Sequence, residues 1–209
     1  MLSNFQEKMT TPIKIISKDE YLKTNKKPNQ NTVWNKISKP WKLYRSKKIK
    51  SIQEFLKNKK GKIIDLGCGS GRNMIPNPNI EYTGIDFSEG QLKKAKEYII
   101  NNKIKAKLIK AKASDLSTLK DNFFDHGLFI ATLHCIEKEE GRKKALKEFH
   151  RVLKPNSRAL ITTWNSNDPR FNHIKNKGDI YMAWHVNQIP KMRYYYLFKK
   201  QELINLIKS

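Results

Sequence analysis

The central part of the chain alternates short apolar runs with amphipathic stretches. The run at 123–132 is apolar nearly throughout its middle, which is typical of a strand buried on both faces of a parallel sheet. Helices are expected at 91–101, where Leu92, Ala95 and Ile99 share one face, and at 139–153, which ends before Pro155. This alternation predicts an α/β fold, with a parallel sheet covered by helices on both faces. The expected strands are 62–66, 80–85, 105–110, 123–132 and 158–164.

The flanking segments are more polar, and we expect them to surround the sheet. The spacing of apolar residues over 33–56 predicts two helices that are broken near Pro40, with Gly61 as a stop signal. Residues 1–31 read as a basic arm and linker, in which the isoleucines at 13–16 are compatible with a short strand. The remaining domain, 32–209, then divides into a core at 61–165 and substrate-side elements at 32–60 and 166–209.

The end of the chain combines aromatic residues with a short helix. The run from Arg193 to Phe198 is expected to be a strand, in which Tyr194 and Tyr196 share one face and Tyr195 takes the other. An amphipathic helix is expected at 200–208.

Charge is the strongest compositional signal. The 209 residues carry a net charge of +24, and residues 1–60 alone hold sixteen Lys or Arg against four Asp or Glu. Such a balance favours a polyanionic partner, nucleic acid first. Lysine, asparagine and isoleucine are all abundant, however, so part of the excess is also explained by A+T-rich coding and solvated lysines.

Cysteine content and hydropathy exclude several protein classes. The chain has two cysteines, Cys68 and Cys135, and no C-x-x-C motif, which excludes a disulfide framework and a zinc finger. We therefore expect no metal site and a reducing, cytoplasmic location. No apolar run reaches about 18 residues, and the N-terminus lacks the pattern of a signal peptide, so no membrane association is expected.

The candidate site chemistry begins where the first strand of the core ends. Asp65 leads into a loop whose glycines alternate as G-x-G-x-G, a pattern that allows a ligand to approach the backbone closely. Asp86 follows the second strand 21 residues later, near the spacing expected for a carboxylate that holds a ribose diol. Asp86 could instead cap the next helix. The loop is neither G-x-G-x-x-G nor a P-loop, so a ribose ligand without a pyrophosphate fits better.

These motifs resemble those of class I S-adenosylmethionine-dependent methyltransferases over residues 61–165. The resemblance implies a Rossmann-like sheet, S-adenosyl-L-methionine as cofactor and ribose binding by Asp86. It also implies that Asp115 accepts a hydrogen bond from the adenine amino group. The strand that ends at Ile130 would face the methionine part. The cofactor-binding residues it implies are Asp65, Gly67, Cys68, Gly69, Gly71, Asp86, Phe87, Ser114, Asp115, Ile130 and Ala131.

A narrower resemblance covers about fifty residues outside this core. Val33–Ile37 with Trp41 and Arg45, and Gly178–Trp184 with Arg193–Phe198, look like the tRNA wobble-uridine carboxymethyl methyltransferases. That family esterifies 5-carboxymethyluridine at position 34 in the tRNA anticodon loop, often with a small zinc-binding activator subunit. The chain has Met-Ala-Trp at 182–184 where the family usually has Val-Pro-Trp, and Tyr196 where it usually has His. It also stops before the two strands that normally close this fold, so we expect an incomplete C-terminal edge.

The resemblance also implies how the acceptor is handled. A carboxylate acceptor is ionised at neutral pH and needs positioning rather than a general base. Arg193, Tyr196 and Arg45 are the candidates for holding it, and His134 lies near the expected site. The expected partners are the anticodon loop, whose bases can stack on Trp or Tyr rings, and an activator docked on the edge strand 105–110. Two alternatives stay open: a methyltransferase for a small metabolite, and a non-catalytic RNA-binding subunit with this fold.

Overall fold

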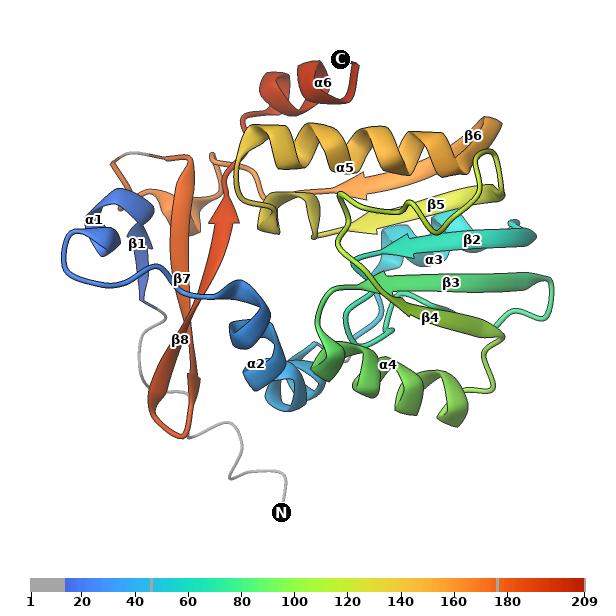
Figure 1. Cartoon of the computed structure of the whole chain (residues 1–209), viewed down its shortest axis with the longest axis horizontal. Coiled ribbons are helices and arrows are strands. Elements are labelled where there is room, and N and C mark those ends of the chain that lie inside the picture. The colour runs from blue at the N-terminus through green and yellow to red at the C-terminus, as the bar shows by residue number, and fades with distance from the viewer. Residues whose placement is uncertain (1–13, 46, 176, 209) are drawn as a thin grey trace.

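The computed structural model describes residues 14–45, 47–175 and 177–208, and these form two sheets joined by helices (Figure 1). The main sheet holds five strands and the second sheet holds three. The strands are β1 (Ile15–Ser17), β2 (Gly61–Leu66), β3 (Ile80–Asp86), β4 (Ala106–Lys110), β5 (Phe124–Ile130), β6 (Leu153–Thr162), β7 (Asp179–Val186) and β8 (Ile189–Tyr196). The helices are α1 (Lys18–Leu22), α2 (Gln30–Tyr44), α3 (Lys50–Leu56), α4 (Glu89–Asn101), α5 (Glu139–Val152) and α6 (Lys200–Lys208), with 3₁₀ turns at Leu133–Cys135 and Pro169–Phe171.

The main sheet is parallel throughout and has the order β4-β3-β2-β5-β6. This confirms the predicted α/β class and places β4, the expected edge strand, at one edge of the sheet. The other edge is β6, which begins at Leu153, directly after α5 and earlier than expected. Because all five strands run the same way, the ends of β2, β3 and β5 meet along one edge, where ligands of open α/β sheets bind.

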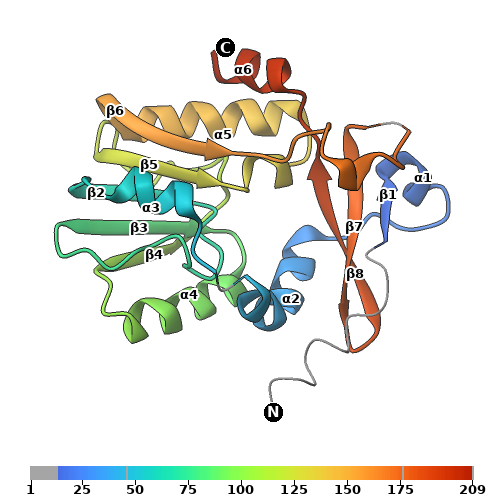
Figure 2. The same ribbon diagram turned by 180° about the vertical axis from the view of Figure 1, so that it is seen from behind.

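Helices cover both faces of this sheet (Figures 1 and 2). On one face, Phe149 of α5 and Phe198 pack with Leu66 and Phe129, and Leu203 of α6 is partly buried against the same cluster. On the other face, Leu56 of α3 and Ile99 of α4 pack against side chains of β2, β3 and β5. Alternate residues along each strand supply the two clusters, as the two-residue period of a strand requires.

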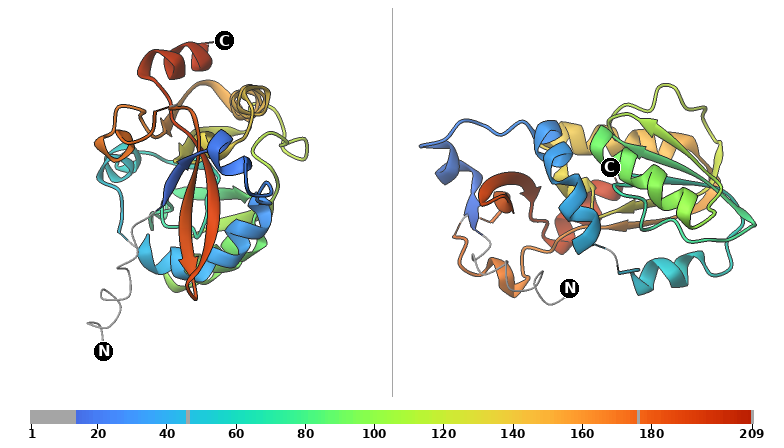
Figure 3. Two further views of the ribbon diagram at one scale, coloured as in Figure 1. Left: turned by 90° about the vertical axis from the view of Figure 1, so that its left-hand side faces the viewer. Right: turned by 90° about the horizontal axis from the view of Figure 1, so that it is seen from below.

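The second sheet is antiparallel and has the order β1-β7-β8 (Figure 3). Its hairpin, β7 and β8, stands beside the main sheet rather than extending it. Within residues 14–31, for which the sequence predicts an arm and linker, Ile15–Ser17 forms β1 of this sheet: Ile15 pairs with Met182, and α1 follows directly. Residues 1–13, the rest of the predicted arm, lie outside the described residues.

Helix α2 connects the two sheets and corrects the predicted break at Pro40. It runs from Gln30 to Tyr44 straight through Pro40, and the interruption falls between Arg45 and Lys50. Burial of Ile37 and close packing on α4 hold the helix together despite the missing N–H of the proline. Gly90 permits this packing, because a Cβ there would lie 2.9 Å from the Ser38 hydroxyl.

Within the described residues, no helix has the length and apolar character needed to cross a bilayer.

Candidate active site

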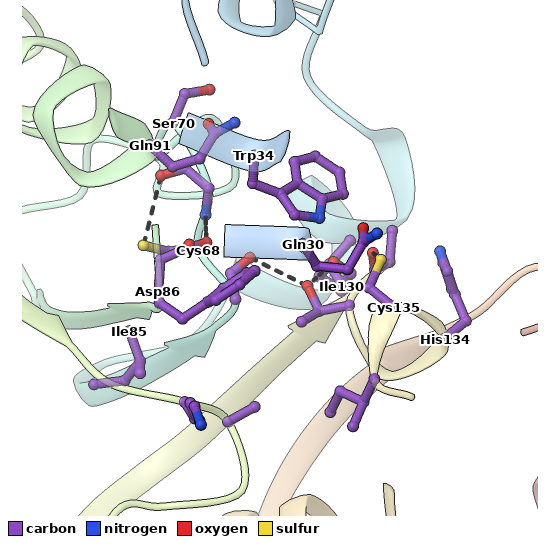
Figure 4. A pocket seen from close by; sticks show the side chains of 18 of the residues that line it. Gln30, Trp34, Cys68, Ser70, Ile85, Asp86, Gln91, Ile130, His134 and Cys135 are labelled. Atoms are coloured by element: carbon purple, nitrogen blue, oxygen red, sulfur yellow. Dashed lines mark hydrogen bonds between the residues drawn. The ribbon is translucent and has the colours of Figure 1, made fainter. Parts of the chain in front are cut away.

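A cavity of 450 Å³ opens where β2, β3 and β5 end (Figure 4). This volume lies in the range of small-molecule and cofactor sites. One side is formed by the glycine loop, Asp86 and Gln91, and Gln30 and Trp34 of α2 lie across it. Other wall residues lie at or after the ends of β4, β5 and β6, and include Ser114, Ile130, Thr132, His134, Cys135 and Trp164. Trp41, Arg45 and Tyr195 are also part of the wall.

The glycine loop needs glycine for two different reasons. Gly67 has φ +75°, and a Cβ there would lie 2.2 Å from the Thr132 side chain, so no other residue fits. Gly69 has φ +53° with open space around it, which leaves its backbone accessible from the cavity. Gly71 is not part of the cavity wall: it packs on Ala95 of α4. The expected cofactor residues Gly67, Cys68 and Gly69 therefore line the cavity, and Gly71 supports the loop from behind.

Asp86 is the carboxylate at the end of β3, and it faces the cavity while bracing its loops. Its Oδ2 accepts the Gly69 N–H at 2.9 Å and its Oδ1 accepts the Ser88 N–H at 2.9 Å. The cap of α4 is Ser88, whose hydroxyl accepts the Gln91 N–H, so Asp86 is not the helix cap. Burial raises the pKa of Asp86 to about 6, although the two N–H donors work against this rise. Since a carboxylate has about four lone-pair sites, Asp86 can still accept two ligand hydroxyls.

Asp65 lies one layer behind this wall and does not line the cavity. It is fully buried, and neither of its carboxylate oxygens has a hydrogen-bond partner among the described residues. Burial, and then the neighbouring Asp86 charge, raise the pKa of Asp65 to about 7. Arg72, which does line the cavity, favours the ionised form of Asp65. Asp65 is thus a second carboxyl group, buried beneath the glycine loop, that titrates near neutral pH.

The other expected cofactor residues divide into two groups. Phe87, Ser114, Ile130 and Ala131 line the cavity as expected. Asp115 does not: its side chain is exposed and accepts the hydroxyl of Ser117 at 2.9 Å. The turn after β4 thus points Ser114 inward and turns the Asp115 carboxylate back on its own loop.

Aromatic rings and guanidinium groups gather on the far side of the cavity. Arg45 lines it and stacks on Trp41 at 5.0 Å, and its buried Nε has no partner among the described residues. Arg193 lies one layer deeper, only 2% exposed, between the rings of Trp41 and Trp184. These two arginines take part in no ion pair described for the chain.

Tyr195, rather than Tyr196, is the tyrosine that reaches the cavity. The Tyr195 hydroxyl accepts a hydrogen bond from Arg193 Nη1 at 2.7 Å. Tyr196 points to the opposite face of β8, where its hydroxyl bonds Glu202 and its ring lies under Arg142. The alternation along the strand was predicted correctly, but it did not reveal which face is turned to the site. Burial raises the pKa of Tyr195 well above its usual value, so its hydroxyl keeps a proton that it can donate.

His134 lines the cavity as an uncharged ring. Its Nδ1 accepts the Trp164 N–H at 3.2 Å, and its ring stacks on Trp164 at 5.0 Å. Burial, and then the nearby Arg45 charge, lower the pKa of His134 to about 3. His134 is therefore neutral through the physiological range and forms part of an aromatic wall.

Several lining residues were not anticipated from the sequence. Gln30 lay in the predicted linker, and Glu137 and Gln91 belong to no recognised motif. Gln91 leaves both ends of its buried amide without a partner among the described residues. Arg72 directly follows the glycine loop, which was the one available signal.

The donor set fits the cofactor that the sequence resemblance implies. Asp86 offers acceptors for a ribose diol, Ile85 and Ile130 give apolar walls, and Ser114 adds a polar side chain to the wall after β4. The unpaired Gln91 amide and the accessible Gly69 backbone supply further polar groups. Arg45 and Arg72 are available for the carboxylate of the methionine end.

Comparison with known sequences agrees with this geometry. A family model described as a methyltransferase domain matches residues 57–202. A tRNA (carboxymethyluridine(34)-5-O)-methyltransferase of Schizosaccharomyces pombe is 26% identical over 85% of this chain and 85% of its own length. A protein of the same name from Arabidopsis thaliana is 37% identical in sequence. That match covers 49% of this chain and 24% of the length of the relative.

Solved structures support the fold. The 1,6-didemethyltoxoflavin-N1-methyltransferase of Burkholderia thailandensis, solved with bound 1,6-didemethyltoxoflavin and S-adenosylhomocysteine, superposes with a TM-score of 0.64. The match covers 96% of this chain and 84% of that chain at 16% identity. This chain and that protein thus share their overall fold.

Proposed function

We propose that the substrate of this chain, which belongs to the family of S-adenosylmethionine-dependent methyltransferases, is tRNA. The proposed acceptor is the carboxylate of 5-carboxymethyluridine at position 34, and the product is its methyl ester. The cofactor, S-adenosyl-L-methionine, follows from the family. The tRNA substrate is supported by the names of the relatives and by the chemistry of the acceptor side.

The observation that carries the proposal is a set of three arginines at the cavity that have no ion pair described for the chain. Arg45 and Arg72 line it and Arg193 lies directly behind it, and none of the three is in an ion pair described for the chain. Buried charges are normally paired, because their desolvation is costly. The cofactor brings one carboxylate, together with a sulfonium and an ammonium. Arg72 already faces Asp65, and the cofactor carboxylate can take one more guanidinium, which leaves at least one for an anionic group on the acceptor.

The residues of the site suit transfer to a group that is already ionised. S-Adenosylmethionine supplies a methyl group on a sulfonium, and transfer to a carboxylate breaks a C–S bond, forms a C–O bond and neutralises both charges. Arg193 holds the Tyr195 hydroxyl by donating to it, which leaves the phenol proton free for a carboxylate oxygen. Arg45 supplies the charge that attracts this carboxylate. No base is needed, and neutral His134 packs on the acceptor side as a wall.

Recognition of an unpaired base is supported by the rim of the site. Tyr44 is 53% exposed at the end of α2, and Trp184 holds its ring edge-on at 5.1 Å. A fixed and exposed aromatic ring next to Arg45 is a suitable stacking surface for a nucleobase. The net charge of +24 favours the phosphate backbone.

A small zinc-binding activator subunit, docked by strand addition on β4, is part of the proposal. Among the residues that the structure describes, β4 pairs with β3 alone, which leaves one side of its backbone for another strand. Lys107 is exposed on this strand, and Lys105 and Lys110 at its ends bond Glu81 and Glu89. We expect low activity for the chain alone and recovery with the activator. Full activity of the isolated monomer would contradict this part of the proposal.

Nucleoside mass spectrometry tests the proposed function. tRNA that carries 5-carboxymethyluridine is incubated with the protein, the activator and labelled S-adenosylmethionine, and its nucleosides are then separated. We expect the label in one modified uridine, whose mass has increased by one methyl-for-hydrogen exchange. Label in another nucleoside would refute the acceptor, and label only in small metabolites would favour a small-molecule methyltransferase.

A further inference from the structure

A second hollow lies on the other side of α2 from the catalytic cavity, and we propose that it binds the RNA backbone next to the methylated nucleotide. We call it the lysine groove. Its volume is 210 Å³, and three separate segments form it: the stretch from Tyr21 to Asn29, the first turns of α2, and the start of β8. This inference rests on the proposed RNA substrate and assigns a contact site to it. The groove is lined by Tyr21, Lys26, Pro28, Asn29, Thr32, Val33, Lys36, Pro190, Lys191 and Met192.

The charge of the lysine groove is positive and uncompensated. Lys26, Lys36 and Lys191 line it, and none of its lining residues is acidic. None of these lysines takes part in an ion pair described for the chain. The neighbouring Lys27, by contrast, is paired with Glu137. Three like charges around one hollow repel each other, and a phosphate between them would relieve this repulsion.

The position of the groove relative to the cavity points to a polymer that occupies both. Gln30 lines the cavity, while Asn29 and Thr32, its neighbours in the chain, line the groove. The Gln30 amide donates to the Met192 carbonyl at 3.2 Å and accepts the Tyr194 N–H at 3.0 Å, which fixes α2 to the free edge of β8. The two hollows are therefore separated by about the width of one helix, roughly 10 Å.

This arrangement fits single-stranded RNA rather than an isolated small molecule. Gln30 and Trp34 of α2 lie across one side of the cavity (Figure 4), and the lysine groove lies on the other side of the same helix, so an RNA backbone that crosses α2 reaches both hollows. The lysine groove lies beyond this helix and offers three cations to adjacent phosphates. Lysine binds phosphate as a point charge and without base preference, so the groove contributes affinity and register rather than sequence specificity.

The test compares two triple variants of equal net charge. Lys26→Gln, Lys36→Gln and Lys191→Gln together remove the charges of the groove. The matched control, Lys120→Gln, Lys144→Gln and Lys147→Gln, removes three exposed charges near and on α5, across the molecule from α2 (Figure 1). Binding of an unmodified anticodon stem–loop RNA is measured against salt concentration, and calorimetry with S-adenosylmethionine verifies that each variant keeps its fold and its cofactor site.

We expect the groove variant to bind the RNA at least tenfold more weakly at physiological salt. The slope of log affinity against log salt should also flatten by about 2, at roughly 0.7 for each lost phosphate contact on a single strand. The control should stay close to the wild type, and both variants should bind the cofactor normally. Equal RNA affinity and slope for the two triple variants would overturn the inference, as would a wild-type protein without salt-dependent RNA binding.

The outcomes separate this inference from the proposed function. If the groove variant loses RNA affinity but the wild type transfers no methyl group to tRNA, the groove stands and the proposed function fails. If tRNA is methylated and the groove variant binds and reacts like the control, the proposed function stands and the groove fails. If the triple variant does not fold, the single variants Lys26→Gln and Lys36→Gln replace it. Each should show part of the loss of RNA affinity and part of the flattening of the salt slope, and RNA binding equal to the wild type in both would overturn the inference.

Discussion

Asp86 is the residue whose substitution should affect cofactor binding most directly. Its two oxygens already accept the Gly69 and Ser88 N–H groups at 2.9 Å and face the cavity with their remaining lone pairs. Asp86→Asn replaces one oxygen by an NH₂ group, which cannot accept from the backbone or from a ribose hydroxyl. The substitution therefore removes at least one charge-assisted bond to the ligand, worth about 1.5–3 kcal/mol.

This loss corresponds to an approximately ten- to hundredfold rise in the Kd of S-adenosylmethionine, since about 1.4 kcal/mol changes an equilibrium tenfold. Isothermal titration calorimetry measures it. Glu89→Gln is the matched control, because Glu89 lies three residues later, is exposed and bonds Lys110. The Kd of this variant for S-adenosylmethionine should stay within about twofold of the wild-type value.

The pH dependence gives an independent check on the same residue. The pKa of Asp86 is raised to about 6, so the free protein loses the ionised acceptor as the pH falls below 6. Wild-type affinity should therefore be constant above pH 7 and weaken below 6, whereas Asp86→Asn should lack this dependence. An unchanged Kd in Asp86→Asn, or an identical pH profile for the two proteins, would refute the assignment of Asp86 to the ribose.

Three further predictions concern the groups around the cavity. Asp65 is buried and has a pKa raised to about 7 from an ordinary value near 3.8, so the folded wild-type protein loses stability as the pH rises between these two values. In thermal melts of the cofactor-free protein, the stability of Asp65→Asn relative to the wild type should therefore increase from pH 4 to 8. A difference in melting temperature that does not grow with pH would contradict this. His134 is neutral and does not act as a base, so His134→Phe should slow single-turnover methyl transfer less than tenfold and leave the rate independent of pH from about 6.5 to 8.5. If the wild-type rate rose tenfold per pH unit and this rise disappeared in His134→Phe, His134 would be a general base. Tyr195→Phe and Arg193→Lys each break the 2.7 Å bond between these two side chains, so both should raise KM for the RNA and slow methyl transfer while cofactor affinity stays unchanged. If Tyr196→Phe slowed transfer as much as Tyr195→Phe, the acceptor would lie on the face of β8 that carries Tyr196.

The elements that the sequence predicted well are those whose local pattern and tertiary environment agree. The strands β2, β3, β4 and β5 and the helices α4, α5 and α6 begin and end within about two residues of expectation. Their apolar runs are buried on both faces of the sheet, and their helices have one apolar face. The glycine loop and Asp86 were likewise predictable, because a backbone with positive φ and a carboxylate at a strand end leave a clear pattern.

The misplaced features depend on contacts between distant parts of the chain. Pro40 is a local helix breaker, but α4 and β8 hold α2 together through it. The polar stretch before Gln30 gave no sign that the Gln30 side chain would bond the edge of β8. Tyr195 and Tyr196 are indistinguishable by composition, and only the placement of the hairpin beside the main sheet decides which hydroxyl reaches the cavity.

A pair of matched RNA substrates shows whether the methyl acceptor is a carboxylate on RNA. One anticodon stem–loop carries 5-carboxymethyluridine at the wobble position, and the other carries the corresponding carboxamide, which has the same shape without the charge. Single-turnover transfer of labelled methyl is measured for both RNAs, and the products are treated with mild alkali. We expect transfer to the carboxylate RNA alone and release of the label by alkali, because the product is an ester. Equal transfer to the carboxamide RNA, or a label that survives alkali, would contradict it.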